Sequence, residues 1–581
     1  MRDLLRKFHL AWAGLYFSIL TVWMTWPLPT KMLDSMVGRV GDNIYFVWMI
    51  GWLQKALFQL RVNPFNVWFL NYPEGWSLAY TEITPANLLI ALPFSLLGGP
   101  MFGYNMALLL SFVLSGLGMY LWVRRMTGST AAGLLAGTAF AFIPYRFAHF
   151  LIGHLNLSGT QWFPFFFMGL FEIVEARRWN WKPAVVAGIA LGLIGLTSQY
   201  YLYMCLIITA VMVLAQLVWI DRSRWKDWLF WKHLMLAGFV SLPLIIAAVA
   251  PFVSLSQQGG LPDRNISIVR PYSASPTDFL LPSTDHFLWG SWVGANFNRD
   301  LWIEATLYIG LVAGILALLA WIKRKDSPHQ LVIKMMVVGT LLAVILAMGI
   351  DFHWNAESVL IRVPDFLADR LGRTEVPIPL PGFVLFYTFP FYAKLRALMR
   401  FGIFALVFIC AMAGLGSDWL VKRLPPKLKT TAAVILILMV LFDFYPGPYS
   451  EFAQVPPRTV DGWLAQQPDE APLVQMPFKL AEDQEQTYYT LFHGKPYVGG
   501  FFNAFPPHQY REVFPILEGF PDETSVALLR EFGVKYVLVQ ASEYADMEQV
   551  QSECEALNLD LVIKLDGQWV FILPEGGSHG D

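Results

Sequence analysis

The sequence predicts an α-helical polytopic membrane protein of about eleven transmembrane helices, followed by a small C-terminal α/β domain outside the cytoplasm. The 581 residues are 56% hydrophobic and only 14% charged, whereas soluble domains carry about 25% charged residues. Residues 446–581 hold 21 acidic and 7 basic side chains, a net of −14, and the preceding part has a net of +12. A basic membrane body joined to an acidic tail argues against nucleic acid as a partner.

Eleven apolar segments can each form a membrane-spanning helix. A bilayer core about 30 Å thick needs about 20 apolar residues of α-helix, and the shorter segments can extend into their polar flanks. The first segment follows the basic start MRDLLRKFH and lacks a small-residue cleavage site, so we expect an uncleaved helix. The segments run approximately over residues 10–26, 104–122, 131–144, 158–173, 184–197, 201–220, 234–253, 305–322, 331–350, 401–415 and 431–444.

Lysine and arginine clusters orient these helices, because cytoplasmic loops are enriched in both residues. Every second connection carries such a cluster, as at Arg124 and Arg125. This pattern predicts a cell-membrane protein with a cytoplasmic N-terminus. The long loops 28–87, 254–304 and 351–400 and the C-terminal domain then face outward. The apolar segment 85–97 has only 13 residues and would invert every later loop if it spanned the bilayer, so we interpret it as a re-entrant or interfacial helix.

The chain therefore divides into a transmembrane domain over residues 1–445 and an extracytoplasmic α/β domain over residues 446–581. In the second domain we expect strands at 471–478, 534–539 and 561–572, and a helix at 525–532. Asp566 and Gly567 give a hairpin turn inside the last of these strand segments.

The first outer loop contains an aspartate, Asp42, in the stretch GRVGDNIYFVWMIGWLQKALF. A helix beginning at Asn43 would place Tyr45, Trp48 and Trp52 on one face, as expected for a helix lying flat in the membrane interface. Asp42 then has two interpretations. It is either the N-cap of this helix, which the local sequence favours, or a carboxylate that reaches a cavity.

Longer stretches of the membrane part resemble a known superfamily. One helix, a long outer loop with an acidic residue, interfacial helices, a bundle and a terminal outer domain together resemble the GT-C glycosyltransferases. Protein O-mannosyltransferases and lipid A aminoarabinose transferases belong to that group. The stretches GDNIYFVWMIGW, NYPEGWSLAYTE, YNMALLLSFVLSGLGMYLWVRRMTGS and PYRFAHFLIGHLNLSGTQW are similar to uncharacterised bacterial membrane proteins grouped with these enzymes, and LLREFGVKYVLV is similar to their outer domains.

The resemblance implies a cell-envelope glycosyltransferase that moves a hexose or pentose, with inversion, from a polyprenyl-phosphate carrier to an acceptor glycan, lipid or protein. In such an enzyme a carboxylate at the membrane surface accepts the proton of the acceptor hydroxyl. The family's first-loop acid corresponds to Asp42 alone. Asn43 stands where many relatives have a second acid, so the sequence does not support a divalent metal, and no cofactor is predicted. Glu82 is a second carboxylate that can reach the site, or else lies in the first turn of the following helix.

A phosphate leaving group requires cations on the outer side, where basic residues are scarce. The segment KLRALMRFG supplies Lys394, Arg396 and Arg400 immediately before a span. If this segment is helical, Arg396 and Arg400 lie four residues apart and point the same way, which suits a phosphate by charge and by forked geometry. The alternative is that both side chains extend to lipid headgroups.

The outer connection PYRFAHFLIGHLNLSGTQW contributes Arg146, His149, His154 and Gln161. The two histidines are five residues apart, which is the wrong spacing for two metal ligands on one helical face. His154 is a candidate for hydrogen bonding to a sugar or diphosphate, whereas the local sequence favours ordinary loop packing for this connection.

Three further side chains at outer helix ends are candidates for substrate binding. Gln199 and Tyr200 offer polar and aromatic surfaces that suit a sugar, although tyrosine is also typical of an interface belt. Glu304 lies at the outer entrance of its span, where an ionisable residue often has a function.

Two other classes of function remain open. A transporter or flippase of a lipid-linked intermediate would need ionisable groups at mid-membrane and often two related halves, and the spans show neither. A non-catalytic assembly protein would keep the same fold without activity. The sugar, the acceptor and the oligomeric state cannot be predicted from these residues.

Overall fold

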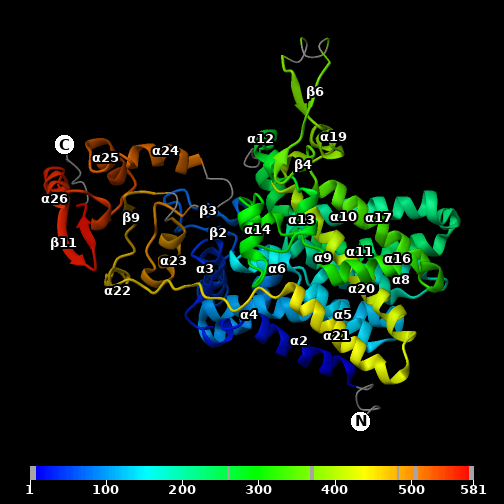
Figure 1. Ribbon diagram of the computed structural model, residues 1–581. Coiled ribbons are helices and arrows are strands. Elements are labelled where there is room, and N and C mark those ends of the chain that lie inside the picture. The colour runs from blue at the N-terminus through cyan, green and yellow to red at the C-terminus, as the bar shows by residue number, and fades with distance from the viewer. Residues whose placement is uncertain are drawn as a thin grey trace.

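A computed structural model describes residues 8–257, 262–364, 366, 369, 372–479, 483–500 and 508–574. Figure 1 shows a helical body that holds most of the chain and, at one end of it, a smaller group of helices and strands from the C-terminal part.

Each of the eleven segments expected to cross the membrane contains a helix. Six helices within the described residues are long and apolar enough to cross a bilayer. This makes the chain a multi-pass membrane protein, while the number eleven stays a prediction. The helices at the eleven segments are α2 (His9–Met24), α4 (Pro85–Thr127), α5 (Thr130–Ala141), α8 (Trp162–Glu175), α9 (Trp181–Thr197), α10 (Gln199–Ala215), α11 (Trp228–Gln257), α16 (Leu311–Ile322), α17 (Gln330–Ala347), α20 (Gly402–Lys422) and α21 (Pro426–Phe444).

The apolar segment 85–97 forms the first arm of α4 and folds back along the second arm. Gly99 has a φ of +86° and is followed by Pro100, and this pair breaks the helix sharply. A Cβ atom added to Gly103 would lie 2.9 Å from the carbonyl oxygen of Ala91, so the two arms touch closely. The segment is therefore a short helix paired with the next one. Its depth in a bilayer stays a prediction.

Helix α3 (Asp42–Gln54) differs from the expected interfacial helix. Its aromatic residues do share a face, since the Trp48 ring stacks on Tyr45 and on Trp52 with centroids 6.4 Å apart in each pair. The helix is nevertheless buried almost throughout. Trp48 Nε1 donates to Thr490 Oγ1 at 3.1 Å, on helix α23 (Asp483–His493) of the C-terminal part. The expectation of a helix lying flat at the lipid surface is wrong, because the C-terminal part covers this aromatic face.

The outer loops fold into short helices and two-stranded ribbons. The ribbon of β6 (Leu360–Arg362) and β7 (Glu375–Pro377) projects away from the body in Figure 1. The remaining elements of these loops are α6 (Pro144–Leu151), α7 (Leu155–Ser158), α12 (Ile266–Val269), α13 (Pro276–Leu280), α14 (Gly290–Asn296), α15 (Trp302–Ala305), α19 (Pro381–Thr388), β2 (Asn66–Val67), β3 (Trp76–Ser77), β4 (His353–Trp354) and β5 (Glu357–Ser358).

The C-terminal part contains a four-stranded sheet in the order β11-β12-β10-β9. All three segments expected to be strands contain strands, and Asp566 and Gly567 form the turn between β11 and β12 with φ values of 48° and 81°. β9 pairs in parallel with β10, and the other pairs are antiparallel. The elements are α22 (Thr459–Ala465), β9 (Leu473–Met476), α23, α24 (His508–Leu517), α25 (Glu523–Glu531), β10 (Tyr536–Gln540), α26 (Met547–Ala556), β11 (Asp560–Leu565) and β12 (Gln568–Ile572).

The first outer loop is tied directly to the segment that leads into the C-terminal part. Strand β1 (Met36–Val37) pairs antiparallel with β8 (Phe452–Ala453). The Gly38 N–H donates to the Glu451 carbonyl at 3.0 Å, and Arg39 Nε lies 2.7 Å from Glu451 Oε1. These contacts fix the backbone four residues before Asp42. The division of the chain at residue 446 stays a prediction.

Candidate active site

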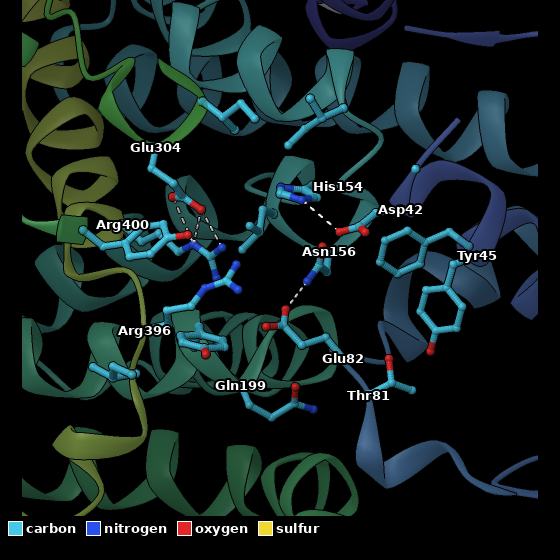
Figure 2. Close-up of a pocket in the computed structure, with 18 of the residues that line it drawn as sticks. Asp42, Tyr45, Thr81, Glu82, His154, Asn156, Gln199, Glu304, Arg396 and Arg400 are labelled. Carbon is cyan, nitrogen blue, oxygen red and sulfur yellow. Dashed lines mark hydrogen bonds and ion pairs between the residues drawn. The ribbon is translucent and has the colours of Figure 1, made fainter. Parts of the chain in front are cut away.

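A cavity of about 1230 Å³ contains most of the candidate residues. It is lined by Asp42 and Glu82 of the first outer loop, by the N-terminal end of α10 and the C-terminal end of α11, and by Pro446, Pro448, Tyr449, Ser450 and Glu451 before the C-terminal part. Figure 2 shows Arg396 and Arg400 on one side and Asp42 and Tyr45 on the other, with Glu82 and Asn156 between them. This volume exceeds the roughly 300–1,000 Å³ of typical small-molecule sites.

Asp42 is the first residue of α3, and the N-cap position belongs to Gly41, which has no side chain to cap the helix. Asn43 makes the local bonds instead: its Oδ1 accepts from the N–H groups of Gly41 and Ile44 at 2.9 and 2.8 Å. The N-cap interpretation of Asp42 is therefore wrong. Its carboxylate lines the cavity, with Oδ2 3.0 Å from Nε2 of His154.

Glu82 precedes α4, so it does not occupy the first turn of that helix. It accepts a hydrogen bond from Nδ2 of Asn156, which lies on α7. The Asn87 side chain of α4 holds the same connection by donating to the Leu155 carbonyl at 2.8 Å. Asn156 was not predicted to be a site residue. The only local feature that could have indicated it is its place two residues after His154, in GHLN.

The two histidines meet through a turn after α6. Gly153 adopts a φ of +78°, and the His154 N–H donates back to the His149 carbonyl at 2.9 Å. The turn brings Nδ1 of His149 within 2.9 Å of Nδ1 of His154. His149 is fully buried, and its Nε2 lies 4.0 Å from Oε2 of Glu304. The spacing of five residues is unsuited to one helical face, and it is the helix end that allows the pair to form.

Glu304 and Arg400 form a buried ion pair at the cavity wall. Arg400 Nη2 and Nε lie 2.6 and 3.0 Å from Glu304 Oε1, and both side chains are less than 8% exposed. Burial by itself raises the pKa of Glu304, but the Arg400 guanidinium and the two imidazoles hold it at about 2. The Arg400 guanidinium also lies 5.0 Å from the centroid of the Tyr200 ring. The charge of Arg400 is thus already balanced by a protein carboxylate.

Arg396 has a different environment from Arg400. The segment is not one helix, because two 3-10 turns, Tyr392–Lys394 and Leu398–Phe401, flank an extended Leu395 and Ala397. Arg396 is half-buried, lines the cavity and stacks 5.1 Å from the centroid of Tyr272. Among the described residues, no carboxylate lies within ion-pair distance of its guanidinium. Its charge therefore remains open to an anionic ligand.

Lys394, the third cation of this segment, also lines the cavity. Its Nζ lies 3.1 Å from Oδ1 of Asp263.

One side of the cavity is apolar. It is formed by Leu202 and Leu206 of α10 and by Ile245, Val249, Phe252 and Val253 of α11, and we call these six residues the apolar wall. Gln199 and Tyr200 begin α10 beside it. The Gln199 amide donates to the Ala248 carbonyl at 3.2 Å, so it joins the two helices. We call a second set of lining residues the polar wall: Asp42, Glu82, His154, Asn156, Glu304, Arg396 and Arg400.

No group of three or more histidine, cysteine, aspartate or glutamate side chains within the described part of the chain is arranged to hold a metal ion. Arg146 and Gln161 serve the packing of α6 and α7 instead. Arg146 donates to the Ala141 and Ser158 carbonyls, and Gln161 donates to Asn87 Oδ1.

Solved glycosyltransferase structures share this fold. The archaeal oligosaccharyltransferase AglB from Archaeoglobus fulgidus, solved with an inhibitory peptide and a dolichol-phosphate, matches 99% of this chain and 75% of its own, with 12% identity and a TM-score of 0.52. The arabinofuranosyltransferase AftD from Mycobacteria matches with 15% identity and a TM-score of 0.55; 97% of this chain covers 41% of that one. The expected resemblance to GT-C glycosyltransferases is thus confirmed at the level of the fold.

Sequence comparison gives the family. No curated protein matches the chain significantly. Residues 19–373, more than half of the chain, match the model of the family described as Domain of unknown function (DUF6311). The chain belongs to this family.

Proposed function

We propose that this protein is an integral membrane glycosyltransferase that transfers a sugar, with inversion, from a polyprenyl-phosphate donor to an acceptor on the extracytoplasmic side. One observation carries the proposal. A single cavity contains a carboxylate, Asp42, an arginine whose charge no described carboxylate balances, Arg396, and an apolar wall.

The donor phosphate binds Arg396 in this proposal. A guanidinium suits a phosphate because it offers parallel N–H donors and a permanent charge. The ion pair of Arg400 and Glu304 has no net charge and lies on the same side of the cavity as Arg396. The polyprenyl tail lies along the apolar wall of α10 and α11, and AglB, which shares the fold, binds a dolichol-phosphate. The tail reaches this wall laterally from the bilayer.

Asp42 acts as the general base. The acceptor hydroxyl loses its proton to the Asp42 carboxylate as its oxygen bonds the anomeric carbon of the sugar. The bond between that carbon and the phosphate oxygen breaks on the opposite face, so the configuration inverts. The phosphate keeps the bonding electron pair, and Arg396 stabilises the added charge. A positioned base of this kind contributes about 10²–10⁴-fold to a rate.

Residues 446–581, which are the C-terminal part together with the segment that leads into it, form the outer domain that closes the cavity and holds the acceptor. Residues of the segment 446–451 line the cavity, and Gln484 at the start of α23 reaches it as well.

We further propose eleven spans and a cytoplasmic N-terminus, since the basic connections then share one side.

The test is transfer by the purified full-length protein in liposomes supplied with a panel of polyprenyl-phosphate monosaccharides. We expect Asp42→Asn to lower transfer about 10²–10⁴-fold and to leave donor binding within about twofold. Asp560→Asn, an exposed substitution on β11, is the matched control and should transfer normally. Normal transfer by Asp42→Asn would remove this residue from the mechanism. Movement of intact lipid-linked sugar across the bilayer without transfer would favour a flippase.

A further inference from the structure

We propose that the loop 351–400 carries a membrane-docking arm, which lies along the surface of the bilayer with its apolar side chains toward the acyl chains. The arm consists of the ribbon β6–β7 with its adjoining residues, 359–364 and 372–380, and of α19 with the residues that follow it up to 391. Its partner is the lipid leaflet at the end of the bundle where the arm begins. The arm would dock in this way whether or not the protein transfers a sugar.

The ribbon has one apolar face and one face with charges. Successive side chains of a strand point to opposite faces. Ile361 lies opposite Val376 in the register, and Arg362 lies opposite Glu375. The apolar pair therefore belongs to one face and the charged pair to the other. The apolar face consists of Val359, Ile361, Val363, Val376 and Ile378.

The described part of the chain leaves this apolar face partly open. Ile361 is 47% exposed, and Val376 is partly exposed. An isolated two-stranded ribbon is only marginally stable in water, and soluble proteins rarely expose contiguous apolar patches. The composition of the face therefore calls for an apolar environment outside the protein.

Helix α19 extends the apolar surface of the arm toward the bundle. A Cβ atom added to Gly382 would collide with the Gly349 carbonyl oxygen, so the helix lies directly against the chain that leaves α17. Val384 and Tyr387 of α19 are exposed and lie three residues apart, so they share one side of the helix. Phe391, after the helix, is exposed as well.

The arm is continuous with the lipid-facing surface of two membrane helices. Both α10 and α17 belong to segments that are long and apolar enough to cross a bilayer. Tyr203 of α10 donates to the Pro390 carbonyl at 2.5 Å, and its ring centroid lies 6.4 Å from that of Phe389. Leu341 and Ile345 of α17 are exposed along the span. Lipid that surrounds these two helices therefore reaches the arm.

The direction of the arm fits the plane of a membrane. In Figure 1 the ribbon points upward, across the left-to-right course of the long helices, and it begins at the end of the bundle that carries the C-terminal part. Because a bilayer surrounds the bundle from the side, an arm with this direction runs along the bilayer surface. Tyrosine, found here as Tyr387, is typical of that layer.

The test uses single cysteines labelled with an environment-sensitive fluorophore, in the full-length protein with one copy in each lipid nanodisc. The native cysteines are buried, which keeps background labelling low. At Ile361→Cys and Tyr387→Cys we expect a shift of emission to shorter wavelength, quenching by nitroxide groups on the acyl chains, and loss of quenching by aqueous iodide. Val562→Cys is the matched control, because Val562 is also 47% exposed but lies on β11 of the C-terminal part. Its label should be quenched by iodide and not by the lipid nitroxide.

The two faces of the ribbon give a second comparison. A label at Arg362→Cys should be quenched more by iodide and less by the lipid nitroxide than one at Ile361→Cys. Equal quenching at these neighbours would contradict the assignment of the faces.

Iodide quenching at Ile361→Cys and Tyr387→Cys as strong as at Val562→Cys would overturn the proposal. Protection that appears only when two copies share a nanodisc would also overturn it, because the arm would then bind a second copy of the chain. These measurements need no transfer assay, so an arm that docks in a protein without transferase activity would contradict the proposed function alone.

Discussion

The two walls of the cavity are built in different ways. In the polar wall most charges are held by a partner from a distant part of the chain, as Arg400 is held by Glu304 and Glu82 by Asn156, whereas Arg396 has no described carboxylate as partner. In the apolar wall two helices present aliphatic and aromatic side chains, all of them partly or largely exposed except Leu202. A fixed charge array can stabilise one reacting geometry, whereas a loose apolar surface can accept a long and flexible chain. The effects of substitutions on stability and on ligand binding should therefore differ between the two walls.

The largest effect on stability is expected from Glu304→Gln in the polar wall. It leaves the buried Arg400 charge unpaired, which costs about 3–5 kcal/mol. The folded pKa of Glu304 lies near 2, below its ordinary value of 4.5. Its stabilising contribution is therefore present above pH 4.5 and is lost as the pH falls toward 2.

Denaturant unfolding in mild detergent measures the loss. Glu375→Gln, an exposed substitution on β7, is the matched control and should change stability by less than about 0.5 kcal/mol. Equal stabilities of the two variants would mean that the polar wall does not depend on this pair.

Arg396→Gln should weaken donor binding more than it affects stability. The loss of a charge-assisted hydrogen bond of about 1.5–3 kcal/mol corresponds to roughly a 10- to 150-fold weaker affinity for polyprenyl phosphate. Arg396→Lys should recover part of it, because lysine keeps the charge but not the fork. Titration of the lipid phosphate against the purified protein measures this, with Arg362→Gln on the exposed strand β6 as control. If Arg396→Gln left the affinity for the lipid phosphate unchanged, the phosphate headgroup would bind somewhere other than at Arg396.

Phe252→Ala tests the apolar wall. We expect long-chain polyprenyl phosphate to bind about 1–2 kcal/mol more weakly, since the ring is partly buried and full burial contributes about 1.5–3 kcal/mol. A phosphate with a single isoprene unit should bind unchanged. Phe239, on α11 outside the cavity and 76% exposed, provides the control Phe239→Ala. The same loss for both chain lengths would mean that the ring contacts the headgroup instead of the tail.

The smallest effect is expected at the rim, in Arg39→Gln. This residue and Glu451 are 86% and 58% exposed, and such pairs contribute about 0–1 kcal/mol. The strand pair β1–β8 should continue to hold the first outer loop. A thermal shift as large as that of Glu304→Gln would show that the loop depends on this ion pair and not on its backbone.

Local sequence predicted the parts of the molecule that local forces determine. The apolar segments gave the helices, and Asp566 with Gly567 gave the β11–β12 turn, because both follow from composition and backbone preference. The burial of α3 could not be predicted, since the C-terminal helix that covers its aromatic face follows about 440 residues later.

Eight residues selected from the sequence share one cavity, and their roles there stay predictions. Asp42, Glu82, His154, Gln199, Tyr200, Glu304, Arg396 and Arg400 all line the cavity. The pairing of Arg400 with Glu304 joins residues 96 positions apart and leaves no local signal. The contact between His149 and His154 did have a local sequence signal. Gly153 follows an amphipathic helix, and its positive φ allows the chain to turn back so that the two rings meet.

The most direct measurement is an experimental structure of the full-length protein with polyprenyl phosphate bound. We expect a phosphate oxygen about 3 Å from the Arg396 guanidinium, with the first isoprene units against α10 and α11 and Asp42 facing the headgroup across the cavity. A phosphate bound outside this cavity, or one held on the cytoplasmic side, would contradict it.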